Sequence, residues 1–221
     1  VMMDAAVTED DATKARISEA AAPLDEIRNE VVAEASEPID GARENCRYRE
    51  CQMGNLVADA MLDRVKDQGT QIAIQNGGGL RASIDAGEVT MGEVLTVLPF
   101  QNTLATFQLK GSDVVAALEN GVSQIEDGAG RFPQVAGMRD SFQRSAPPGA
   151  RIRTVELREG DAWVTLDPAR TYGVVSNDYV RRGGDGYAVF AERAIDAYDY
   201  GPALDLVVAE FLIAGGPYQP Y

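Results

Sequence analysis

The stretch Gln75–Arg81, QNGGGLR, places three consecutive glycines between an amide and an arginine. Glycines reach φ values that other residues avoid, and they let a ligand lie against the main chain. Arg81 adds a forked guanidinium group that suits a phosphate or a carboxylate. No Gly-Lys-Ser/Thr follows, so this is not a Walker A loop. We interpret the stretch as a binding loop around Asn76, Gly78 and Arg81. The alternative is a tight loop with a surface arginine.

A second glycine-rich stretch, RRGGDGY at Arg181–Tyr187, also follows an apolar run. GDG alone is a common turn sequence. Each glycine-rich stretch, however, has an aromatic residue nearby, Phe100 in LPF and Tyr179 in NDY. Two such rings can hold a planar base between them, and stacking contributes about 1–3 kcal/mol per base in nucleic-acid systems. The alternative is that both rings pack in the core.

Arginines also gather in GARENCRYREC, where Arg43, Arg47 and Arg49 lie within seven residues. In a chain with a formal net charge of −15, such a cluster is suited to meet an anion. The alternative is surface ion pairing with Glu44 and Glu50. Both interpretations remain open from the residues alone.

The composition excludes several classes of function. The 221 residues contain no histidine, which rules out Ser-His-Asp and Cys-His catalysis and any histidine-ligated metal within this chain. The charge of −15 argues against nucleic acid and anionic membranes as partners. No apolar run is long enough to span a membrane, and no acidic spacing indicates a two-metal centre. The residues alone predict a binding site for a planar, anionic small molecule.

The two cysteines, Cys46 and Cys51, are five positions apart. Such a pair can close a short disulfide loop if the backbone turns there. A disulfide would imply an exported protein. The alternative is two unpaired thiols. Two cysteines without histidine make a zinc site a poor interpretation.

Helical periodicity and punctuation predict the helices and their ends. We expect Pro23 to bend or break the first helix, Asn55 to help cap the second, Gly69 to end it, and Ser112 to cap the fourth. The predicted helices cover residues 9–35, 53–69, 91–98, 113–125 and 201–216.

The strands alternate irregularly with these helices. Residues 126–150 read as turns with short apolar pieces, and a hairpin over 151–166 should turn near Gly160 and Asp161. Other strands are expected at residues 71–75, 103–111 and 171–180. This order favours a mixed α+β sandwich over a doubly wound parallel sheet.

Three motifs together, at residues 46–62, 75–118 and 172–190, resemble the C-terminal domain of the 5'-nucleotidases. That family includes UDP-sugar hydrolases and 2',3'-cyclic-nucleotide phosphodiesterases with 3'-nucleotidase activity. The likeness runs from about residue 38 to residue 213. It implies mixed β-sheets sandwiched with helices, preceded by a long linker helix. The expected division is a linker region at 1–37 and a substrate-binding domain at 38–221.

The resemblance also implies roles for single residues. Phe100 and Tyr179 would sandwich the base, although the family usually has Phe at the second place. Asn76 would hydrogen-bond the base or position its loop, and Asp185 would accept hydrogen bonds from the ribose hydroxyls. At Gly78 the ligand would lie against the main chain. The phosphate would be held by Arg47, Arg81 and Arg43. Cys46 and Cys51 would form a disulfide, as in some members.

In this family, an N-terminal metallophosphoesterase domain carries two divalent metal ions with an Asp-His pair and performs the hydrolysis. A chain without histidine cannot contain that pair. The expectation is a nucleotide- or nucleoside-binding domain of a periplasmic or secreted 5'-nucleotidase-type hydrolase, inactive by itself and holding no metal. The alternatives are a stand-alone nucleotide-binding module, a domain of a UDP-sugar or cyclic-nucleotide hydrolase, or an interaction domain that has lost the pocket.

Overall fold

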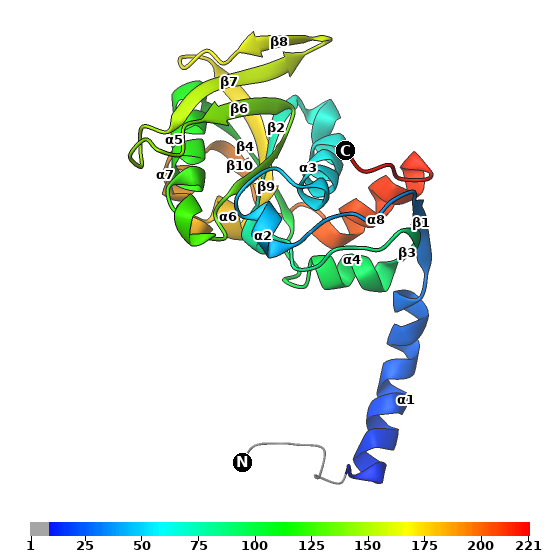
Figure 1. Cartoon of the computed structure of the whole chain (residues 1–221). Helices are drawn as coiled ribbons and strands as arrows, with labels where there is room; N and C mark the ends of the chain where they lie inside the picture. The colour runs from blue at the N-terminus through cyan, green and yellow to red at the C-terminus, as the bar shows by residue number, and fades with distance from the viewer. Residues whose placement is uncertain (1–8) are drawn as a thin grey trace.

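A five-stranded mixed sheet forms the centre of the computed structural model, which describes residues 9–221 (Figure 1). Its strand order is β10 (Ile195–Tyr198), β4 (Leu104–Lys110), β9 (Thr171–Asn177), β2 (Thr70–Asn76) and β5 (Pro133–Ala136). Strands β2 and β9 run parallel, and the other neighbours are antiparallel. The carboxyl ends of β2 and β9 therefore meet at one edge, where β4 also begins, because Leu104 pairs with Asn177.

Apolar side chains cover both faces of this sheet. Ala73 and Val175 belong to one buried cluster, whereas their neighbours Ile72 and Val174 belong to another. This alternation follows from the two-residue period of a strand. In Figure 1, α3, α4 and α8 lie on one side of the sheet and α5 and α7 on the other. The predicted α+β fold, with mixed sheets between helices, is confirmed.

The remaining elements complete these layers. The helices are α1 (Asp11–Arg28), α2 (Arg43–Cys46), α3 (Gln52–Val65), α4 (Met91–Val97), α5 (Gly111–Val122), α6 (Asp178–Arg181), α7 (Ala188–Arg193) and α8 (Leu204–Gly215). A three-stranded sheet is built from β6 (Met138–Phe142), β7 (Ile152–Glu159) and β8 (Ala162–Thr165). A two-stranded sheet joins β1 (Val31–Ala35) to β3 (Gly87–Thr90).

The first helix ends earlier than its periodicity predicts. The expected helix over 9–35 stops at Arg28, and residues 31–35 form strand β1, so that prediction was wrong at its end. The β-branched pair Val31–Val32 favours a strand, and pairing with β3 supplies the hydrogen bonds. Pro23 lies inside α1 and does not end it. Residues 1–8 of the expected linker region lie outside the described residues.

Helix α1 extends away from the domain body (Figure 1). None of its residues is buried, and its apolar side chains Ile17, Leu24 and Ile27 are exposed. This arrangement suits the linker helix that the resemblance implies. None of the helices in residues 9–221 has both the length and the apolar character needed to cross a membrane.

Two predicted caps were wrong. Helix α3 has Cys51 at its N-cap, while Asn55 is buried inside the helix and donates to the Glu50 carboxylate and the Tyr221 carbonyl. Helix α5 begins at Gly111, ahead of Ser112. The end of the α3 segment at Gly69 is confirmed, because Gly69 adopts the left-handed conformation with φ +78°.

The segment expected to be turns contains strands β5 and β6. Strand β6 is short and largely polar outside Met138 and Phe142, so its own sequence carries little strand signal. Pairing with β7 decides its conformation. The β7–β8 hairpin is confirmed, with Gly160 at φ +61° in its turn. Helix α7 and strand β10 were not predicted.

Asp140 on β6 lines a second cleft of about 470 Å³. Burial, and then the negative charge of Glu50, raise the pKa of Asp140 from 3.8 to about 6. A carboxyl whose pKa is raised on folding stabilises the native state at pH values below the pKa that it has in the unfolded chain. That contribution is lost as the pH rises from about 3.8 to about 6. Asp140→Asn should therefore increase the free energy of unfolding at pH 7 by about 1–3 kcal/mol.

Urea denaturation at pH 4 and pH 7 measures this effect. Asp161→Asn, at the exposed hairpin turn, makes the same charge change and serves as the control. A gain of the same size at both pH values would contradict the prediction.

Candidate functional site

A cleft of about 900 Å³ opens at the edge of the sheet where β2 and β9 end and β4 begins. Five segments from distant parts of the sequence border it, because that strand order brings them together. The lining residues are Arg47, Gly78, Gly79, Phe100, Asn102, Gly130, Asp178, Tyr179, Arg182, Gly183, Gly184 and Asp185.

Phe100 and Tyr179 both present their rings to this cleft. Phe100 is 56% exposed and Tyr179 is 49% exposed, so neither ring packs in the core. The Arg81 guanidinium carbon lies 5.7 Å from the centroid of the Phe100 ring, a cation–π distance. Two exposed aromatic rings, one from the turn after α4 and one from α6, thus border one cavity.

Hydrogen bonds join the two segments that carry these rings. The Asp178 carboxylate accepts from the Asn102 amide at 2.9 Å and from the Thr103 backbone N–H at 3.1 Å. The Asp178 N–H donates to the Thr103 carbonyl at 2.9 Å. The positions of Phe100 and Tyr179 are therefore coupled through the residues beside them.

Asp185 is held in a conformation that few non-glycine residues adopt. Its φ is +54°, in the left-handed region. The Asn76 amide donates to its Oδ2 at 2.7 Å, and the Asn120 amide donates to its carbonyl at 3.1 Å. Such a backbone persists only where surrounding contacts hold it, and it is common at ligand sites.

Asn76 is only 4% exposed, so its amide faces Asp185 and not the open cleft. Its Oδ1 accepts from the Asn177 amide at 3.0 Å, and Asn177 also donates to the Gln75 Oε1 at 2.9 Å. These bonds link the ends of β2 and β9 beneath the cleft. The Asn76 side chain thus contacts Asp185 and Asn177, and its role toward a ligand stays a prediction.

Arg47 is far in the sequence from the residues that carry the aromatic rings. In space it lies near Asp185. Burial lowers the pKa of Arg47, the like charges of Arg43 and Arg81 lower it further, and the Asp185 carboxylate opposes this shift. Three guanidinium groups therefore share one region. Within the described residues, the buried Arg47 Nε has no hydrogen-bond partner.

The third arginine of the first cluster has a different environment. Arg49 is exposed and its guanidinium donates to the Asn45 side chain. Arg47 lines the cleft, and Arg43 and Arg81 lie near enough to lower its pKa, but Arg43, Arg49 and Arg81 do not line the cleft themselves. The cluster that the sequence shows is thus divided between the site and the surface.

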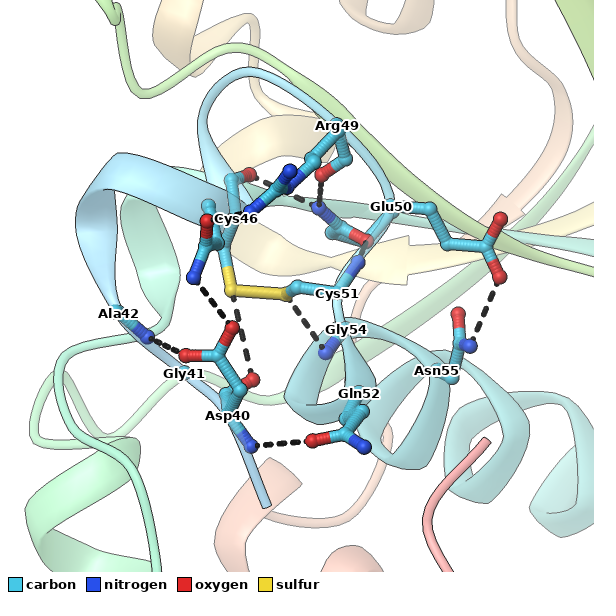
Figure 2. Close-up of a disulfide and its surroundings, with 12 residues drawn as sticks. Asp40, Gly41, Ala42, Cys46, Arg49, Glu50, Cys51, Gln52, Gly54 and Asn55 are labelled. Carbon is cyan, nitrogen blue, oxygen red and sulfur yellow. Dashed lines mark hydrogen bonds between the residues drawn. A yellow bond between two sulfur atoms is a disulfide. The ribbon is translucent and has the colours of Figure 1, made fainter. Parts of the chain in front are cut away.

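The Cys46–Cys51 disulfide is present, and both cysteines are buried (Figure 2). It closes the short loop that carries Arg47. The buried Gln134 amide donates to the carbonyls of Cys46 and Arg49 at 2.9 and 2.8 Å, and it accepts from the Cys51 N–H at 3.1 Å. On the other side, Asp40 accepts from the Ala42 N–H at 2.9 Å. These contacts fix the loop against the domain.

The sequence profile described as 5'-nucleotidase, C-terminal domain matches residues 31–192. This chain belongs to that family. The match contains every residue of the cleft and its arginine cluster.

Individual relatives agree with this assignment. The trifunctional nucleotide phosphoesterase protein YfkN of Bacillus subtilis is 42% identical over 195 residues, which cover 87% of this chain and 13% of that protein. The snake venom 5'-nucleotidase of Naja atra is 30% identical over 202 residues, covering 85% of this chain and 38% of the relative. The chain therefore spans less than half the length of these proteins.

Among solved structures, the 5'-nucleotidase precursor of Thermus thermophilus superposes with a TM-score of 0.90 at 42% identity. That likeness covers 97% of this chain and 42% of the Thermus chain.

Within this 5'-nucleotidase C-terminal domain, the three glycines serve close packing. Gly77–Gly79 form a 3-10 turn, and none has a positive φ, so the expectation that they use values closed to other residues is wrong. A Cβ on Gly77 would lie 2.1 Å from the Cys46 carbonyl oxygen, and one on Gly78 would lie 2.8 Å from the Gly130 Cα. The absence of side chains lets three loops meet beside the cleft, which Gly78 and Gly79 also line.

Gly77→Ala should therefore destabilise the domain by about 2 kcal/mol, because the Cys46 loop must move to admit a methyl group. Gly215→Ala is the matched control, since a Cβ there meets nothing within 4 Å. Thermal unfolding measures both variants. Equal melting temperatures for the two would show that the loop yields without cost.

Several residues of the site were not identified as candidates from the sequence. Asn102, Asp178 and Arg182 line the cleft, and Arg182 lies 3.6 Å from the Asp178 carboxylate. Their only signal was adjacency to Phe100 and Tyr179. Asn120 gave no signal, because it lies on the predicted helix 113–125 and reaches Asp185 through the fold.

The donor set in this region does not suit a metal centre. In residues 9–221, no three histidine, cysteine, aspartate or glutamate side chains gather as metal ligands would. The charged residues that line the cleft are two arginines, Arg47 and Arg182, and two aspartates, Asp178 and Asp185. The guanidinium groups suit an anion.

Proposed function

We propose that this domain binds a nucleotide with its base between Phe100 and Tyr179 and its phosphate toward Arg47. Arg81 and Arg43 would add positive charge at the phosphate, and Asp185 would accept hydrogen bonds from the ribose. The observation that carries the proposal is that two exposed rings from separate segments border one cleft with Asp185 and Arg47. Its volume of about 900 Å³ lies within the range of small-molecule sites.

The charge distribution supports an anionic ligand. The chain has a formal net charge of −15, yet Arg47 and Arg182 line the cleft and Arg81 lies over Phe100. An acidic protein that keeps arginines at one cavity can attract a phosphate there and repel it elsewhere. The Arg47 guanidinium, which lines the cleft, can donate charge-assisted hydrogen bonds to a phosphate.

Hydrolysis would belong to another part of a longer protein. The chain has no histidine, and its described residues form no metal cluster. An N-terminal metallophosphoesterase domain with two divalent metal ions would supply the catalysis, and this domain would position the substrate for it. Its relatives are named as nucleotidases and phosphoesterases, and they are much longer than this chain. We infer that this chain alone does not hydrolyse nucleotides.

We also infer a periplasmic or secreted location. The Cys46–Cys51 disulfide is typical of an oxidising compartment, and one relative is a venom protein. A UDP-sugar or a cyclic nucleotide is the second candidate substrate class, because the family that the motifs resemble includes hydrolases of both. The Bacillus relative is named a trifunctional nucleotide phosphoesterase.

Calorimetric titration with adenosine and AMP, in buffer containing a chelator, tests the binding proposal. We expect both to bind, with AMP tighter, because the base site and the arginine cluster need no metal. No binding of either at millimolar concentration would overturn the proposal for adenine nucleotides, and UDP-glucose and 2',3'-cyclic AMP would test the second class. Metal-dependent turnover of AMP by the pure chain would contradict its inactivity.

A further inference from the structure

The Tyr179 side chain has two functions available to it, because its ring borders the cleft and its hydroxyl contacts Asp185. The hydroxyl donates to the Asp185 Oδ1 at 3.0 Å and accepts from the Asp185 N–H at 3.2 Å. A phenylalanine at this position could stack on a base equally well. It could make neither of these bonds.

The Asp185 carboxylate is consequently held at both of its oxygens. Oδ1 accepts from the Tyr179 hydroxyl, and Oδ2 accepts from the Asn76 amide at 2.7 Å. An ionised carboxylate has about four acceptor positions, so each oxygen retains one for a ligand. These two free positions have a fixed separation and direction, which suits two adjacent hydroxyl groups.

The backbone of Asp185 is fixed as well. Asn120 donates to its carbonyl at 3.1 Å, and the Asn120 Oδ1 accepts from Arg131 at 3.3 Å. Burial first, and then the charge of Asp185, raise the pKa of Tyr179, so the hydroxyl keeps its proton as a donor. The stacking ring and the acceptor carboxylate form one rigid unit.

We propose that the Tyr179 hydroxyl is a positioning group that makes the cleft selective for ribonucleosides over deoxyribonucleosides. This inference rests on the proposed nucleotide-binding function. By orienting the Asp185 carboxylate before the ligand arrives, the hydroxyl allows both ribose hydroxyls to donate without a further loss of side-chain freedom. A ligand that lacks one hydroxyl gains less from this arrangement.

Tyr179→Phe tests the inference, with adenosine and 2'-deoxyadenosine titrated calorimetrically against each variant. We expect adenosine affinity to fall about 3- to 10-fold, the size of one net hydrogen bond, and 2'-deoxyadenosine affinity to change much less. The ribose preference of the protein should fall by the same factor. Tyr200→Phe, at a strongly exposed tyrosine outside the cleft lining, is the matched control.

Asp185→Asn gives an independent check that does not depend on absolute affinities. If the hydroxyl acts through the carboxylate, adding Tyr179→Phe to Asp185→Asn should leave the ribose preference unchanged, since contacting residues are not additive. A purely structural role would lower affinity for both nucleosides equally. In that case the ratio of adenosine affinity to 2'-deoxyadenosine affinity would not change. An unchanged ratio, or one that rises, in Tyr179→Phe would overturn the inference while leaving nucleotide binding intact. Failure of the unaltered protein to bind adenosine would overturn both proposals.

Discussion

Replacing Phe100 with alanine should weaken adenosine binding by at least about tenfold, which corresponds to about 1.4 kcal/mol. Stacking of a base on an aromatic ring contributes about 1–3 kcal/mol, and alanine removes that surface entirely. Because the ring is more than half exposed, its loss should cost the fold little. The expected result is therefore a large change in affinity with a nearly unchanged melting temperature.

Calorimetry with adenosine, AMP and ribose 5-phosphate separates stacking from other contacts. Phe100→Ala should weaken the two ligands that carry a base and leave ribose 5-phosphate unaffected. Phe100→Tyr should retain most of the affinity, because it keeps the ring. Tyr198→Ala removes a comparably exposed ring on β10 that does not line the cleft, and it should leave binding unchanged. Unaltered adenosine affinity in Phe100→Ala would show that the base does not lie on this ring.

Arg47→Ala should remove most of the preference for AMP over adenosine. A hydrogen bond to a charged group contributes about 1.5–3 kcal/mol, so AMP affinity should fall about 10- to 100-fold while adenosine affinity changes little. Burial lowers the pKa of the Arg47 guanidinium, and the like charges of the nearby Arg43 and Arg81 lower it further. Removing it relieves repulsion in the free protein, so the effect should appear in phosphate binding and not in stability.

Arg49→Ala is a close control for this experiment. It removes the same charge from the same disulfide-closed loop, but its guanidinium contacts Asn45 and does not line the cleft. Both variants should unfold at similar temperatures, and only Arg47→Ala should discriminate between the two ligands. Equal losses for adenosine and AMP would assign Arg47 a structural role. No loss for either would place the phosphate elsewhere, with Arg182 at the cleft rim as the next arginine to replace.

Both predictions depend on loops that the fold holds rigidly. The Arg47 loop is closed by a disulfide and hydrogen-bonded to Gln134, and the aromatic loops are joined through Asp178. A preorganised site spends less of its interaction energy on ordering its own side chains when a ligand binds.

Residue types can be read directly from the sequence. Two aromatic residues, an arginine cluster and glycine-rich stretches after strands were identified in this way, because base stacking and phosphate binding need particular side chains. The exposure of the two rings came from the structure, and their roles toward a ligand stay predictions. The α+β class and the β7–β8 hairpin followed from periodicity and turn residues, which are local properties. The cysteine spacing permitted a disulfide, which the structure contains.

Tertiary structure decided what local pattern could not. The parallel pairing of β2 with β9 brings Asn76 and Asn177 together, although they are 101 positions apart. Gln134 and Asn120 gain their roles from partners elsewhere in the chain, so no spacing could reveal them. Gly77 has no room for a side chain because the Cys46 carbonyl lies against it, and the fold brings these two residues together. By itself, the sequence determined the chemistry available to this protein, since side-chain types are local. The fold determined which groups meet and which way they face, since those depend on packing between distant segments.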